Sequence, residues 1–135
     1  MANQLYETGR SAFLRGEIDW QGDDMVVALL DGTYTRSSSD EFAADLTGVL
    51  ATAPLTGCTV LADGVADADD VSVSGVSLGE TVERIVIYKD TGSAATSPLI
   101  WYADENDDTT PISRAGDGSA ITLVWSAAPT RVFRI

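Results

Sequence analysis

The sequence predicts a mainly β protein with one or two short N-terminal helices, folded as an antiparallel β-sandwich or barrel. Short apolar or alternating segments recur from residue 54 to the C-terminus, and Gly, Asp and Ser residues separate them. The chain has 135 residues, of which 44% are apolar and 21% are charged, which suffices for one domain with a buried core. We therefore expect a single domain over 1–135, with an N-terminal arm or helix at 1–20 and a strand-rich core at 25–135.

The first element that the pattern predicts is a short helix. Asn3 is a plausible N-cap and Gly16 fits the position where a helix stops. Between them, four small or apolar residues recur at helical spacing: Leu5, Gly9, Ala12 and Phe13. Gly9 inside a helix costs about 1 kcal/mol relative to Ala, and a close backbone contact there would explain it.

A strand and a second helix are expected next. Residues 25–30 are apolar on both alternating faces, which is typical of a buried strand, and Asp31-Gly32 then signals a turn. A helix is predicted near 39–50, because Ser38 and Glu41 match a capping box. Four apolar residues follow at helical spacing and would form one stripe: Phe42, Leu46, Val49 and Leu50.

The rest of the chain is predicted to be β. Six short segments have strand patterns, at 58–62, 71–76, 82–88, 99–102, 121–125 and 132–135. The segments 82–88 and 99–102 are apolar on both faces near their centres, as in strands that are covered on both sides. The spacing of the segments fits short antiparallel strands.

Composition excludes several classes of function. The formal charge is −13, so nucleic acid and anionic membrane would repel the chain, and neither is expected as a partner. With no histidine and a single cysteine, the chain lacks His-based triads, His metal ligands and multi-cysteine metal sites. No catalytic residue and no cofactor is therefore predicted, and the chain is not expected to be an enzyme.

One short motif resembles a catalytic site. Residues 75–79 match the G-x-S-x-G pattern of a hydrolase nucleophile elbow, which places its serine on a strand-to-helix turn beside a general base. Here a strand pattern follows the motif and there is no histidine to act as the base. A glycine turn at a strand end is the favoured interpretation. Cys58 lies in an apolar segment, so we interpret it as a buried small hydrophobic residue.

Two acidic segments are candidates for calcium. Asp104, Asn106 and Asp108 match ligand positions 1, 3 and 5 of an EF-hand loop, but Thr109 and Ala115 stand where that loop needs Gly and Glu. The segment is therefore not an EF-hand, and solvated acidic loops are favoured over a metal site. A looser calcium site would use these three residues or the acids of a second cluster, which are Asp63, Asp67, Asp69 and Asp70.

The tryptophans are candidates for contacts with sugar or protein. Trp101 and Trp125 fall in apolar strand patterns, so a core position is favoured for both. Trp20 lies outside any strong periodicity, which leaves packing over the N-terminal helix and a place in an interface equally open.

Taken together, landmarks along nearly the whole chain resemble a family of small structural proteins of tailed-bacteriophage virions. The resemblance rests on patterns of strand and turn residues rather than on chemistry. The matching segments are Met1–Asn3, Tyr6, Gly9-Arg10, Phe13-Leu14, Gly16, Ile18–Trp20, Val27–Asp31, Asp63–Asp67, Ile85–Gly92, Ser97–Ile100, Trp125 and Phe133.

The resemblance implies a protein of the virion that is made in the host cytoplasm. Combined with the charge, which disfavours a place against packaged DNA, it favours a capsid decoration or cement protein on the outside of the head. Its expected partners are the major capsid protein or other virion proteins, and it is expected to be a homo-oligomer, with a trimer as the hypothesis for a three-fold axis. The predicted interface residues are Leu5, Tyr6, Arg10, Phe13 and Trp20.

Alternatives remain open at this stage. A tail component, associated with the baseplate or a fibre, is the second interpretation, and a small acidic carbohydrate-binding module or lytic enzyme is the third. The acidity also fits a protein adapted to high salt, in which case the charge says nothing about a position in the particle.

Overall fold

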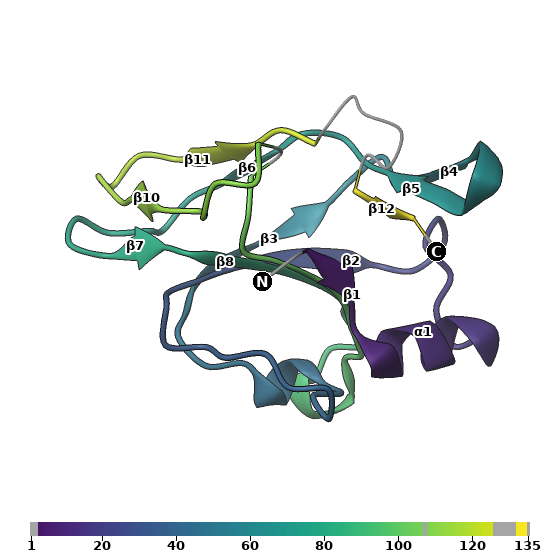
Figure 1. Ribbon diagram of the computed structural model, residues 1–135. Helices are drawn as coiled ribbons and strands as arrows, with labels where there is room; N and C mark the ends of the chain where they lie inside the picture. Colours follow the sequence, from purple (N-terminus) through teal and green to yellow (C-terminus); the bar gives the residue numbers. More distant parts are fainter. Residues whose placement is uncertain (1–2, 107, 126–131, 135) are drawn as a thin grey trace.

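The computed structural model describes residues 3–106, 108–125 and 132–134, and it confirms a mainly β fold with antiparallel sheets. A five-stranded sheet with the order β1-β9-β8-β2-β3 forms its centre. Its strands are β1 (Gln4–Leu5), β2 (Met25–Leu30), β3 (Val49–Leu55), β8 (Arg84–Lys89) and β9 (Leu99–Ala103). All of its pairs are antiparallel, and in Figure 1 the sheet runs across the middle of the molecule.

Three smaller sheets form a second layer, drawn above the central sheet in Figure 1. They pair β10 with β7, β11 with β6, and β12 with β5 and β4. Their strands are β4 (Thr59–Leu61), β5 (Val65–Asp67), β6 (Val71–Val73), β7 (Thr81–Val82), β10 (Arg114–Ala115), β11 (Ile121–Leu123) and β12 (Phe133–Arg134). The two layers make a sandwich-like arrangement, and the described strands do not close into a barrel.

β2 separates two apolar clusters, because its alternate side chains point to opposite faces of the sheet. Val27 and Leu29 lie on the upper face, in a large cluster with side chains of the second layer. Ala28 and Leu30 lie on the lower face, in a smaller cluster that contains three tyrosines: Tyr6, Tyr34 and Tyr102. These four central and C-terminal residues of β2 are fully buried, as the apolar pattern at 25–30 predicts.

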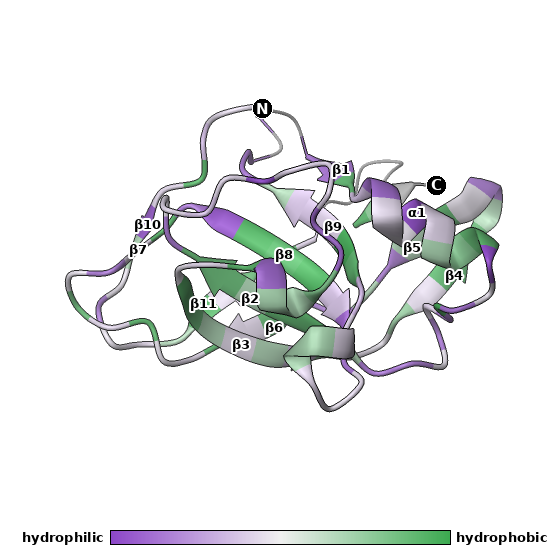
Figure 2. Cartoon of the chain, turned by 90° about the horizontal axis from the view of Figure 1, so that it is seen from below, coloured by the Kyte–Doolittle hydropathy of each residue, from purple (hydrophilic) through white to green (hydrophobic). Residues whose placement is uncertain are grey.

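Irregular segments cover the lower face. They contain two 3₁₀ turns, η1 (Ala43–Asp45) and η3 (Ala94–Thr96), and a bridge between Phe42 and Pro98 joins them. A third such turn, η2 (Ala62–Gly64), connects β4 and β5. Figure 2 views the molecule from this side and shows the segments lying across the hydrophobic middle of β8.

The helix predicted near 39–50 is wrong. Residues 43–45 form only the turn η1, and from Val49 onwards the chain is β3, which pairs with β2 along its whole length. The capping interaction also differs, because the carboxylate of Asp45 accepts the backbone N–H groups of Glu41 and Phe42. Pairing with a buried strand therefore overrides the helical spacing of the apolar residues.

The first helix is confirmed, with different limits. α1 (Glu7–Leu14) follows directly on β1, and its N-cap is Tyr6 rather than Asn3. Gly16 adopts a positive φ of 75° after the helix, as a helix stop requires. At Gly9 a Cβ atom would stand 2.5 Å from the carbonyl oxygen of Leu99, so α1 packs directly on the backbone of β9. This close approach explains a glycine inside a helix.

Candidate functional site

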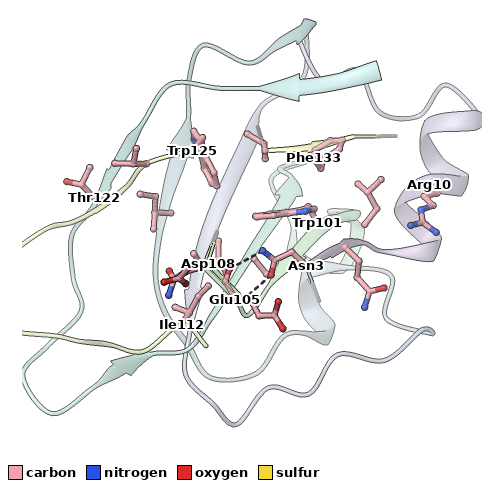
Figure 3. Close-up of a pocket in the computed structure, with 17 residues that line it drawn as sticks. Asn3, Arg10, Trp101, Glu105, Asp108, Ile112, Thr122, Trp125 and Phe133 are labelled. Atoms are coloured by element: carbon pink, nitrogen blue, oxygen red, sulfur yellow. Dashed lines mark hydrogen bonds between the residues drawn. The ribbon is translucent and has the colours of Figure 1, made fainter. Parts of the chain in front are cut away.

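A cleft of about 780 Å³ opens between the two layers, beside the edge of the central sheet (Figure 3). Its floor comes from β1, β8 and β9, its roof from β11, β12 and the residues that follow β11, and one end from α1. The lining residues are Asn3, Gln4, Leu5, Arg10, Ile85, Trp101, Ala103, Glu105, Asn106, Asp108, Ile112, Thr122, Leu123, Val124, Trp125, Val132 and Phe133.

Two tryptophans form the aromatic part of the cleft. The rings of Trp101 and Trp125 meet edge to face, with 6.1 Å between their centroids and 74° between their planes. Trp125 is held by its own hydrogen bonds, because its indole N–H donates to the carbonyl oxygen of Asp69 and its backbone N–H donates to the Asp70 carboxylate. The roof of the cleft is therefore tied to the segment that follows β5.

Trp101 differs from Trp125 in its hydrogen bonding. It is 8% exposed, which confirms the predicted core position, and it comes from the middle of β9. Yet its indole N–H has no hydrogen-bond partner among the described residues, while those of Trp20 and Trp125 both have one. Among the described residues, the buried side-chain atoms without a partner are Arg36 Nε, Arg84 Nε and Asp104 Oδ1, so the Trp101 N–H is not one of them and is accessible to water in the cleft.

The ends of the cleft are polar. Arg10 lies on α1 at one end, is exposed, and makes no ion pair within the described part of the chain. Asp108 lies toward the other end, where one of its carboxylate oxygens accepts the hydroxyl and the backbone N–H of Thr110. These hydrogen bonds hold the pKa of Asp108 below its ordinary value, so the carboxylate stays charged.

Asn3 fastens the N-terminal side of the cleft. Its side-chain oxygen accepts the backbone N–H groups of Asp104 and Glu105, and its amide donates to the Glu105 carbonyl at 3.0 Å. The amide that the sequence suggested as a helix cap thus ties β1 to the end of β9. The hydrogen bonds between Asn3 and Glu105 are drawn in Figure 3.

The predicted interface residues lie in different environments. Leu5, Tyr6 and Trp20 are buried inside the chain, Phe13 is half-buried, and Arg10 is exposed. Of the five, Arg10 and Phe13 thus offer surface to a partner, and their role in an interface stays a prediction.

Trp20, for which the sequence left two environments open, is buried inside the chain. It is 4% exposed, its ring meets Phe133 edge to face at 5.0 Å, and its indole N–H donates to the carbonyl oxygens of Thr59 and Asp67. Its role is therefore to join the segment after α1 to the sheet of β4, β5 and β12.

The calcium candidates of the first acidic segment do not converge. Asp104 accepts the hydroxyl of Tyr102 at 3.0 Å, whereas Asn106 and Asp108 both bond to Thr110. In the second acidic segment, Asp69 accepts the hydroxyl of Thr56 and Asp70 accepts the backbone N–H of Trp125. Across residues 3–106, 108–125 and 132–134, no three acidic or cysteine side chains are grouped to hold a metal ion.

The G-x-S-x-G segment is a turn that leads into strand β7. The backbone N–H of Ser77 donates to the Glu80 carboxylate and the N–H of Glu80 donates back to the Ser77 carbonyl. No helix follows Ser77 within the described residues, so the strand-to-helix geometry of a nucleophile elbow is missing here. Cys58 is half-buried, and burial, with a smaller effect of Asp69, raises the pKa of its thiol to about 11. The thiol is therefore protonated and unreactive at neutral pH.

The cleft itself was not predicted from the sequence. Its walls come from segments that are far apart in the chain, and the strand patterns of Trp101 and Trp125 indicate burial without indicating what the rings border. The available signal was the two tryptophans on strands next to acidic segments, which also fits an ordinary core.

Comparison of the sequence with protein-family models and with curated proteins finds no match. No helix of the described residues is long and apolar enough to cross a membrane.

Proposed function

We propose that this chain is a structural protein of a tailed-bacteriophage particle and that it decorates the outside of the head. The proposal rests on the resemblance of its strand and turn segments to such proteins. The charge of −13 supports an outward position, since packaged DNA would repel the chain. A central sheet that is covered on both faces supports a role that needs a rigid module.

The exposed leucines are the observation that best fits a clamp between neighbouring capsid subunits. Leu14, the last residue of α1, is 88% exposed, and Leu78, in the turn before β7, is 84% exposed. Figure 1 shows α1 and β7 at opposite ends of the molecule. A protein that holds two neighbours together needs a contact surface at each end, and an exposed leucine is suited to bury apolar area there.

The copy number in the particle tests this proposal against a tail location. A decoration protein is among the most abundant proteins of a purified virion, and an antibody raised against it labels the heads of intact particles. A few copies per particle, or labelling confined to the tail, would show a baseplate or fibre-associated component and overturn the proposal.

Substitution of the two leucines tests the clamp itself. We expect Leu14→Ser and Leu78→Ser each to weaken binding of the purified protein to heads that lack it, with the double variant weaker than either. Val49→Ser is the matched control, since Val49 is a 46% exposed apolar residue of the central sheet. Equal binding by all four proteins would contradict the two-ended contact.

The oligomeric state is a separate part of the proposal. On a three-fold axis the protein would be a cyclic trimer, closed by contacts between two different surfaces of each copy. Light scattering after size-exclusion chromatography measures the mass directly. A protein that is a monomer in solution and also binds to heads as a monomer would contradict the trimer hypothesis without contradicting the decoration role.

A further inference from the structure

We propose that the cleft between the layers binds a neutral carbohydrate of one or two sugar rings, a function that does not depend on the role in the particle. A volume of about 780 Å³ lies within the range of small-molecule sites, roughly 300–1,000 Å³. The residues that line the cleft come from both layers, and Figure 3 shows them around the space between the layers.

The lining matches the two kinds of surface that a sugar ring presents. The C–H faces of a sugar are apolar and pack on indole rings, and the cleft contains Trp101 and Trp125 at its centre. The rim of a sugar carries hydroxyl groups that both donate and accept hydrogen bonds. The cleft supplies donors in Arg10 and the Trp101 N–H, and an acceptor in the carboxylate of Asp108, whose Oδ2 accepts no hydrogen bond from the described residues.

The indole N–H of Trp101 is a hydrogen-bond donor that no other described residue uses, so it is available to a bound ligand. The residue is nine-tenths buried, and every other indole N–H of the chain is paired. A hydroxyl of a bound sugar would accept this hydrogen bond in a partly desolvated place, where it contributes more than at an open surface.

The charges select a neutral ligand. Among the described lining residues Arg10 is the one cation, while Asp108 and Glu105 contribute carboxylates, and the chain as a whole carries −13. A phosphate or an acidic sugar would be repelled by this field. A purely apolar ligand would strip water from Arg10 and Asp108 without replacing its hydrogen bonds.

An added peptide strand fits the same edge poorly. β1 has two residues, and the carbonyl of Leu5 already accepts a hydrogen bond from Arg36. Strand addition depends on a row of unpaired backbone groups, and an edge this short supplies few of them.

The indole signals of the three tryptophans in an NMR spectrum of the ¹⁵N-labelled full chain test the proposal. The probes are glucose, galactose, mannose, N-acetylglucosamine and their disaccharides, each raised to about 50 mM, well above a Kd of about 1 mM. We expect at least one saccharide to shift the signals of Trp101 and Trp125 in a saturable way. The signal of Trp20, which is buried outside the cleft lining, stays in place.

Variants separate binding from folding. Trp101→Phe keeps an aromatic ring but removes the N–H, and we expect affinity to fall about tenfold, the loss of roughly one hydrogen bond. Arg10→Ala is expected to weaken binding several-fold, while Arg114→Ala, an exposed arginine outside the cleft, leaves it unchanged. Arg10→Ala replaces a surface residue, so it tests the cleft even where a tryptophan variant fails to fold.

Three results would overturn the proposal. The first is that no saccharide shifts the Trp101 signal. The second is that a saccharide binds but neither Trp101→Phe nor Arg10→Ala weakens it. The third is that the Trp101 signal moves with protein concentration alone, which would assign the cleft to contact with a second copy of the chain.

Discussion

The two faces of the central sheet are both apolar but are covered in different ways. Short strands that carry their own backbone hydrogen bonds lie over the upper face, with side chains such as Val73 and Ile121 filling the space. The lower face is covered by irregular segments whose buried polar groups need other partners. Tyrosines supply them, since the hydroxyl of Tyr6 pairs with that of Tyr34, which donates to Asp40.

The comparison teaches that a sheet face does not need regular structure above it. What it needs is apolar area together with partners for most of the polar groups that are buried with it, although Arg36 Nε, Arg84 Nε and Asp104 Oδ1 are buried without one. On the lower face a chain of hydroxyls and carboxylates provides these partners, and Arg36 adds a cation 5.1 Å from the centre of the Tyr6 ring. We therefore expect the stability of the lower face to depend on the protonation of its tyrosines, and the stability of the upper face to depend on side-chain packing.

Alkaline pH should produce the largest effect. Burial, with hydrogen bonding to Asp104 as the next cause, raises the pKa of Tyr102 to about 12, and burial also raises the pKa values of Tyr6 and Tyr34. Because a raised folded pKa means that the folded state holds its proton more tightly, this stability is complete below about pH 10 and is lost as pH rises toward 12.

Titration of tyrosinate absorbance checks this expectation. Burial also raises the pKa of Tyr88, so all four tyrosines of the native chain should ionise above the ordinary pKa of tyrosine. In the unfolded chain the tyrosines should ionise at the ordinary pKa of about 10. Denaturation midpoints measured in parallel should fall in the same pH window. If one or more tyrosines of the native protein ionise at the ordinary tyrosine pKa, the hydroxyl groups are not buried as described.

Adjacent leucines of β2 give the next largest effect. Leu29 on the upper face and Leu30 on the lower face are both fully buried. Substitution by Ala should cost about 2–5 kcal/mol at each site, and the larger cost is expected for Leu29, because paired strands collapse into a cavity less readily than irregular segments do.

Urea denaturation of Leu29→Ala and Leu30→Ala measures the difference directly, since the two variants share residue type, strand and burial. Val60→Ala, at a 53% exposed position of β4, is the control and should be nearly neutral. A greater loss at Leu30 would mean that the irregular cover is as rigid as the strands.

Removal of one hydroxyl should have a smaller effect. Tyr34→Phe breaks the chain from Tyr6 to Asp40 and leaves the Tyr6 hydroxyl buried without its partner, at a cost of about 1–3 kcal/mol. Tyr88→Phe is the matched control, because the Tyr88 hydroxyl makes no hydrogen bond with the described residues, and this substitution should be nearly neutral. If Tyr34→Phe and Tyr88→Phe lower the free energy of unfolding in urea equally, the hydrogen bonds from Tyr6 through Tyr34 to Asp40 do not contribute to stability.

The strand pattern at 25–30 predicted β2 with its observed limits. A strand that is apolar on both faces is stable only where both faces are buried, as they are in the middle of a covered sheet. The pattern at 39–50 failed for a long-range reason. Leu46 does pack against the lower cluster, but Val49 and the residues after it pair with β2, and one sequence window cannot show that a partner strand is near.

The cleft could be predicted even less. Burial of Trp101 followed from its strand pattern, but the cleft beside it is also lined by Arg10 and Phe133, which are far away in the sequence. Trp20 shows the reverse, since a residue without periodicity turned out to be buried by partners more than thirty residues away. Pairing partners of this kind are properties of the folded chain, and local patterns carry little information about them.

The smallest effect is expected at the cap of η1, in the cover of the lower face. The Asp45 carboxylate accepts the N–H groups of Glu41 and Phe42, which lowers its pKa, so its contribution is present at neutral pH and disappears as pH falls through the folded value. Asp45→Ala should cost about 0.5–1 kcal/mol at pH 7 and nothing at a pH where the carboxylate is protonated. Asp24→Ala replaces an exposed acid whose side chain makes no hydrogen bond with the described residues, and it should leave stability unchanged at both pH values. Urea denaturation at the two pH values distinguishes these cases, and an equal loss in both variants would mean that the carboxylate of Asp45 does not hold the cover in place.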